Sequence, residues 1–233
     1  MIEQSSAKIY LAKERGVNET NVMRSCKTFN SGNYFNEHKA AFGNLCLLND
    51  DTLGAGEAIK MYIEEDGYIV FLPVAGGIVY NDSTGYKAAV IAGEAQIKLT
   101  SPGTVIEIEN PYDKPVNYLQ IRFKPVATSS ADYSEIIEFN IDNCRNRLIP
   151  LTSSNAGLPF ALSITKLEGR ADIVYKPGNK YGGVYAYVIE GAFEAQYRLL
   201  HDGDGSALWN IGSNVEVEAL SNDAILLIAE VGL

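Results

Sequence analysis

Short stretches rich in β-branched and aromatic residues recur along almost the whole chain, and turn-forming residues separate them. The clearest of these stretches are 68–72, 104–108, 116–123 and 224–228. Gly, Pro, Asn and Asp fall between them at intervals of roughly 8–12 residues, a spacing typical of an antiparallel sandwich or barrel. Long helical periodicity is absent. The sequence therefore predicts an all-β fold, with one short helix near 130–136 that Ser130 or Asp132 could cap.

The segment from Lys124 to Leu151 differs from its flanks, because Pro125, two serines and a polar stretch interrupt the strand pattern. The chain on either side of it follows a similar plan. Each half has an extended run, a hairpin marked by glycine, a turn in which an acidic residue follows glycine, and a closing apolar strand. We therefore expect two β-barrels in tandem, with an N-terminal domain over 1–125, a connection with the short helix over 126–150, and a C-terminal domain over 151–233.

The composition excludes several classes of partner. The formal net charge is −10 and the isoelectric point about 4.7, so the chain repels phosphate backbones and anionic lipid surfaces. No apolar run approaches ~18 residues, and the first residues lack the apolar core of a signal peptide. The three cysteines form no C-x-x-C pair, which favours reduced thiols. We expect a cytoplasmic protein with no direct nucleic-acid partner and no membrane contact.

Several segments resemble the pirin family and its quercetinase-like bacterial members. The resemblance covers about 14–125 well and the second half more loosely. It implies a bicupin, that is, two small antiparallel barrels in one chain. The segments that carry it are 14–16, 28–35, 42–51, 92–96, 109–111 and 119–121 in the first half, and 188–191 with the final apolar strand in the second.

The resemblance also implies a metal site, because pirins hold iron or another divalent transition metal with an H-x-H pair and an H-x-E pair on two strands. Residues i and i+2 of a strand share one face, so two such pairs can converge inside a barrel. Here Tyr62 and Glu64 stand at the first two ligand positions, and Ile106 and Ile108 at the other two. Isoleucine cannot bind a metal, so we expect a degenerate site with no metal cofactor.

No other residues replace these ligands in an obvious way. The chain has two histidines, His38 and His201, and each lies in a polar turn without a ligand partner at i+2. Glu107 and Glu109 alternate with the isoleucines and should therefore face solvent. The alternative is a one-residue register slip that turns both glutamates inward, but it would expose two isoleucines at ~2 kcal/mol or more each.

Two further features have both a functional and a structural interpretation. Glu64 has the same strand phase as Tyr62, so it is either a carboxylate at the mouth of a pocket or part of a solvated acidic turn. Tyr185 and Tyr187 share one strand face, and they either line a ligand cavity in the C-terminal barrel or pack as ordinary strand aromatics.

Three functions remain open from the sequence. The favoured one is a non-catalytic protein that binds an unidentified small molecule or protein partner. The alternative is a dioxygenase resembling quercetin 2,3-dioxygenase that holds its metal with substitute ligands. The third is metal-free chemistry with Glu64 as the base beside Tyr62, and only one residue supports it.

Overall fold

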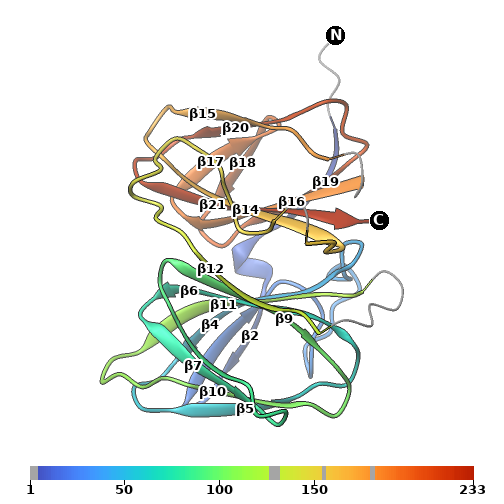
Figure 1. Ribbon diagram of the computed structural model, residues 1–233. Helices are drawn as coiled ribbons and strands as arrows, with labels where there is room; N and C mark the ends of the chain where they lie inside the picture. Colours follow the sequence, from blue (N-terminus) through green and yellow to red (C-terminus); the bar gives the residue numbers. More distant parts are fainter. Residues whose placement is uncertain (1–4, 126–131, 154–155, 179–181) are drawn as a thin grey trace. The chain divides into compact units, whose positions relative to one another are not determined.

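The computed structural model describes residues 5–125, 132–153, 156–178 and 182–233. They form two compact units, each built from antiparallel strands in two sheets (Figure 1). The all-β prediction is confirmed. In the described ranges the only helical element is the three-residue 3-10 turn η1 (Ala12–Glu14), so no helix there is long and apolar enough to cross a membrane.

The first unit comprises Gly16–Ala41 and Leu45–Glu138. Its larger sheet has the strand order β12-β9-β6-β11-β4-β3-β2, and its smaller sheet has the order β5-β10-β7-β8. We call this unit the N-terminal barrel. Its strands are β2 (Gly16–Glu19), β3 (Met23–Lys27), β4 (Leu45–Leu53), β5 (Ala58–Tyr62), β6 (Gly67–Ala75), β7 (Gly77–Asp82), β8 (Lys87–Ile91), β9 (Glu94–Thr100), β10 (Val105–Glu109), β11 (Val116–Phe123) and β12 (Ser134–Glu138).

The second unit, here called the C-terminal barrel, comprises Met1–Arg15, Phe42–Asn44 and Phe139–Leu233. Its sheets have the orders β1-β19-β16-β21-β14-β13 and β15-β20-β17-β18. Its strands are β1 (Ser6–Tyr10), β13 (Ile149–Pro150), β14 (Phe160–Leu167), β15 (Asp172–Tyr175), β16 (Gly182–Glu190), β17 (Ala192–Ala195), β18 (Arg198–His201), β19 (Gly205–Trp209), β20 (Val215–Ala219) and β21 (Ala224–Gly232).

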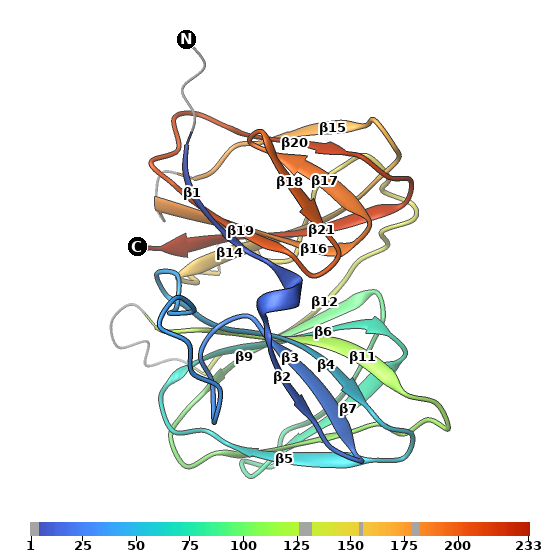
Figure 2. The ribbon, with the colours of Figure 1, turned by 180° about the vertical axis from the view of Figure 1, so that it is seen from behind.

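The N-terminal strand β1 therefore belongs to the C-terminal barrel, whereas the sequence prediction assigned residues 1–125 to one domain. Figure 2 shows β1 beside β19, and the register places Ser6 opposite Trp209 and Tyr10 opposite Gly205. A single strand leaves no sign in its sequence of which distant strand it will pair with. For this reason the pattern of the chain could not assign β1 to its sheet.

The predicted helix in the connection is wrong for the residues that the structure describes. Ser134–Glu138 forms strand β12 and pairs with β9, with Ile136 opposite Gln96. Ser130 lies outside the described residues. The alternation of exposed and half-buried side chains along β12 has the period of a strand, so pairing with an existing sheet edge overrides a weak local helix signal.

A three-residue segment from the first half of the sequence, Phe42–Asn44, belongs to the C-terminal barrel and forms hydrogen bonds with it. The Asn44 side chain donates to the Pro159 carbonyl oxygen at 2.8 Å and accepts a hydrogen bond from the Gly232 N–H at 3.0 Å. Gly43 has φ +55°, and a Cβ there would lie 2.1 Å from the Gly232 carbonyl oxygen. The backbones approach so closely at this point that only glycine fits.

We expect Asn44→Ala to lower the free energy of unfolding by about 1–3 kcal/mol, because it leaves the Gly232 N–H and the Pro159 carbonyl without these hydrogen bonds. Urea unfolding of the variant and of the parent protein measures the difference. Asn33→Ala, at an exposed position, is the matched control and should change little. Equal stability of all three proteins would contradict this role of Asn44.

Candidate functional site

Strands β5 and β10 of the smaller sheet line one side of the N-terminal barrel's interior with apolar side chains, and we call this side the apolar wall. Strand β10 pairs with β5 so that Ile106 lies opposite Met61 and Ile108 lies opposite Ile59. Ile106 and Ile108 are 0% exposed and join a core cluster with Phe71, which comes from the larger sheet. The two isoleucines at the metal-ligand positions are therefore core residues that contact both sheets.

Tyr62 and Glu64 do not join Ile106 and Ile108 in this interior. Tyr62 is 73% exposed and Glu64 is also exposed, whereas their neighbours Met61 and Ile63 pack in the core. The position match to pirins aligned these residues by count along the chain, but it did not establish that their side chains face the interior. An exposed carboxylate lacks the dry surroundings that a general base needs, so the arrangement does not support catalysis by Glu64.

The inward side chains of the apolar wall do not fit a transition metal. They are aliphatic apart from the thioether of Met61, which accepts a hydrogen bond from the Gln120 amide at 3.4 Å. Iron-like ions in such sites need imidazole and carboxylate ligands. In the described part of the chain, no group of three or more His, Cys, Asp or Glu side chains is placed to hold an ion.

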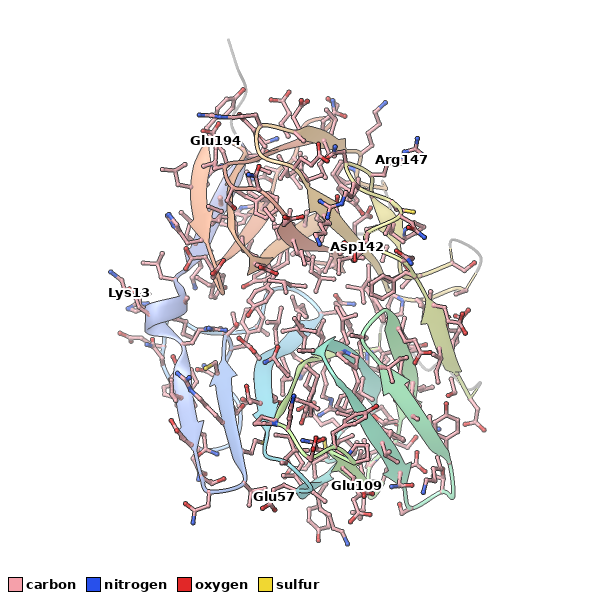
Figure 3. The ribbon with its side chains drawn as sticks, turned by 90° about the vertical axis from the view of Figure 1, so that its left-hand side faces the viewer. Lys13, Glu57, Glu109, Asp142, Arg147 and Glu194 are labelled. Carbon is pink, nitrogen blue, oxygen red and sulfur yellow. The ribbon has the colours of Figure 1, made fainter. Side chains whose placement is uncertain are left out.

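The glutamates on β10 lie on the outer side of the same strand. Glu107 forms an ion pair with Lys60 of β5, with 3.3 Å between the carboxylate oxygen and Nζ, and both side chains are well exposed. Glu109 is exposed, and Figure 3 labels it near the lower end of the N-terminal barrel. The observed register is thus the one in which the isoleucines, and not the glutamates, point into the barrel.

Part of the opposite side of the barrel, on the larger sheet, is polar, and the sequence analysis did not find it. On the larger sheet Tyr118 of β11 lies opposite Asp51 of β4, and Gln120 lies opposite Asn49. Paired residues share a face, and Tyr118 belongs to the core cluster with Ile106 and Ile108. These four residues are called the polar wall below, and all of them are buried. The alternation Asn49-x-Asp51 and Tyr118-x-Gln120 was the available signal.

The electrostatics of the polar wall centre on Asp51. Burial, and to a smaller extent the neighbouring Asp50, raise the pKa of this carboxyl to about 7, although the Ser25 side chain and the charge of Lys27 oppose the shift. Burial, together with the nearby Asp51 carboxylate, also raises the pKa of Tyr118 well above its ordinary value. Both groups therefore strongly favour their uncharged forms compared with the same groups in water.

A second buried carboxylate in the same barrel behaves in the opposite way. Asp82 accepts hydrogen bonds from Tyr80 and Thr84 and lies 3.6 Å from the Lys98 ammonium. Burial tends to raise the pKa of Asp82, but these hydrogen bonds and the Lys98 charge outweigh it and lower the pKa. The barrel can thus provide a buried carboxylate with hydrogen bonds and a positive charge. The raised pKa of Asp51 is therefore specific to its own surroundings.

The remaining candidates of the sequence analysis lie away from any such interior. His38 and His201 have side chains 78% and 73% exposed, beside Glu37 and Asp204 respectively.

Tyr185 and Tyr187 are buried on the face of β16 opposite to the apolar core of the C-terminal barrel. Tyr185 packs against Tyr10 and Phe42, and the Tyr187 hydroxyl accepts a hydrogen bond from Arg15 at 2.9 Å. The pair therefore anchors the N-terminal segment and does not line a cavity inside that barrel.

Two units of antiparallel strands give this protein the two-barrel fold of bacterial pirins. Solved structures agree with this fold. The crystal structure of YhhW from Escherichia coli superposes with a TM-score of 0.84 at 22% identity and covers 98% of this chain and 99% of that one. Bacterial pirin YhhW in complex with nickel(II), from the same organism, gives a TM-score of 0.83 at 21% identity.

Curated proteins similar to this chain carry the name quercetin 2,3-dioxygenase. The Escherichia coli K12 protein of that name is 33% identical over 105 residues, 44% of this chain and 46% of the relative, so this match spans about half the length of either protein. A putative quercetin 2,3-dioxygenase of Zymomonas mobilis is 21% identical over 207 residues, 86% of this chain and 88% of the relative. No protein-family model matches the chain.

Proposed function

We propose that this pirin-like bicupin works as a binding protein and does not carry out the metal-dependent dioxygenation for which its relatives are named. The observation that carries this proposal is the complete burial of Ile106 and Ile108 at the positions where the resemblance expects a histidine and a glutamate. Catalysis at a metal needs a firmly held ion with an open coordination position. The aliphatic wall offers neither ligands nor a position for the ion.

The placement of Tyr62 and Glu64 supports the same proposal. Both side chains are exposed on the outer side of the barrel, so they cannot combine with ligands from the interior to form a substitute site. The partner of the protein is then a molecule recognised by shape and hydrogen bonding, either a small molecule in the barrel or a protein on its surface.

Metal analysis tests the proposal directly. We expect the purified protein, after exposure to Fe(II), Cu(II), Ni(II) or Mn(II) and gel filtration, to retain far less than stoichiometric metal, and we expect EDTA to leave its unfolding temperature unchanged. Oxygen uptake with quercetin should remain at the level without protein. The Escherichia coli quercetin 2,3-dioxygenase serves as the positive control. Stoichiometric metal together with flavonol-dependent oxygen uptake would overturn the proposal.

A further inference from the structure

The polar wall of the N-terminal barrel has more hydrogen-bonding capacity than its own residues use. The Asn49 side-chain oxygen, both Asp51 carboxylate oxygens and the Tyr118 hydroxyl are buried, and none forms a hydrogen bond of normal geometry with the described residues. Ser25 is close enough to lower the pKa of Asp51, but its position does not complete such a bond. Native interiors pair nearly all of their buried polar atoms with protein groups, ordered water or a ligand, so the polar wall has room in its hydrogen bonding for a further molecule.

We propose that the polar wall binds a small, uncharged molecule with a donor-bearing end, a hydroxyl or a primary amide, and an apolar remainder. This proposal rests on the proposed function and deepens it, because it places a ligand of stated chemistry inside the barrel.

The kind of atom that lacks a partner determines the donor-bearing end. Asn49 Oδ1 accepts hydrogen bonds only, and the two Asp51 oxygens are mainly acceptors, whereas Tyr118 has a single proton to donate. Even with Asp51 protonated, the O–H protons of Asp51 and Tyr118 leave acceptor positions on these oxygens unused. A ligand that satisfies this wall must therefore supply several N–H or O–H groups directed at β4 and β11.

The facing wall determines the rest of the ligand. Met61, Ile106 and Ile108 lie on the smaller sheet, and the Gln120–Met61 hydrogen bond shows that side chains of the two walls meet across the interior. The described inward side chains of β5 and β10 carry no charge that could pair with an ionic group, and the Lys27 ammonium, which acts on Asp51, already donates to the Ser31 carbonyl oxygen. Since a charge without a partner in such surroundings is strongly disfavoured, the ligand is uncharged.

Asp82 shows that this need for a partner is not general in the barrel. The Asp82 carboxylate has Tyr80, Thr84 and Lys98 around it, so the larger and smaller sheets together can neutralise a buried acid. Around Asp51 the Ser25 side chain and the Lys27 charge offset burial only in part, and the carboxylate oxygens form no hydrogen bond of normal geometry with the described residues. The polar wall is therefore a place where an external molecule can complete the hydrogen bonding.

Propanamide and butanone are a matched pair of probes, since they have nearly the same shape and only propanamide has N–H donors. The readout is the methyl NMR signals of Met61, Ile106 and Ile108 in the full chain during titration. We expect propanamide to shift these signals in a saturable way. Butanone should bind with an apparent affinity at least about tenfold lower than that of propanamide, because it cannot form the hydrogen bonds to the buried carboxylate.

Variants localise the response. Tyr118→Phe should weaken propanamide binding, while Glu107→Gln, on the outer face of β10, should leave it unchanged. The proposal would be overturned if propanamide gave no saturable shift, if both probes gave the same response, or if Tyr118→Phe bound propanamide as well as the parent protein does. A high-resolution crystal structure with propanamide that shows only water at Asp51 would also overturn it. If propanamide does not bind and the protein holds no metal, only this ligand proposal fails and the proposed function stands. If the protein holds stoichiometric metal, the proposed function fails whether or not propanamide binds.

Discussion

Replacement of Asp51 by asparagine should stabilise the protein relative to the parent by an amount that grows as the pH rises from about 4 to about 7. Burial raises the pKa of Asp51 from 3.8 to about 7, so between these values the folded state holds a proton that the unfolded state has lost. The folded state of the parent protein therefore loses stability as the pH rises through this window, by about 4 kcal/mol in total. Asparagine cannot ionise, so the variant lacks this loss.

Urea unfolding of both proteins at a series of pH values measures the effect. The difference in unfolding free energy should be constant below about pH 4, increase between about pH 4 and 7, and stay constant above that. Asp113→Asn, at an exposed position of the same barrel, is the control for the change in net charge. A difference between Asp51→Asn and the parent that does not vary with pH would show that Asp51 titrates like an aspartate in water.

The second large effect concerns β10. Ile108→Ala should lower the free energy of unfolding by about 2–5 kcal/mol, because it removes buried methyl groups from a core where Ile108 is 0% exposed and leaves a cavity. Glu107→Ala, one residue away on the outer face, should change it by less than about 1 kcal/mol, since its ion pair with Lys60 is exposed to solvent.

The two variants together test the register of β10, because a slip by one residue would exchange the two faces of the strand. Chemical denaturation of each variant and of the parent at one pH is sufficient. A larger loss for Glu107→Ala than for Ile108→Ala would mean that the glutamates point inward, and the carboxylates of β10 would then become candidate metal ligands.

The fold was predictable from the sequence because strand runs and turn residues are local signals. The period of two also placed Ile106 and Ile108 on one face and Glu107 on the other. The same period could not place Tyr62 and Glu64, because they follow one another across the end of β5, where a strand gives way to a loop. An ungapped match assigns positions by counting residues along the chain. Which side of the sheet a side chain points to depends instead on how its strand is paired.

The polar wall was missed for a different reason. Asn49, Asp50 and Asp51 have the composition of a solvated turn, although the structure places them inside β4. Only the pairing of β4 with β11 shows that Asp51 lies opposite Tyr118 in the core. A buried polar group is recognised by what surrounds it in space, and its neighbours here are about 70 positions away along the chain.

The pairing of β1 with β19 has a consequence for how the chain reaches its native state. Ser6 must meet Trp209, so β1 is synthesised well before β19 and has no partner strand until β19 has left the ribosome. Contacts between such distant residues slow folding, since a long loop must close before they form. The nested N-terminal barrel can complete its own sheets earlier. Folding should therefore be sequential, with the inner barrel first and the closure of β1 onto β19 as a late step.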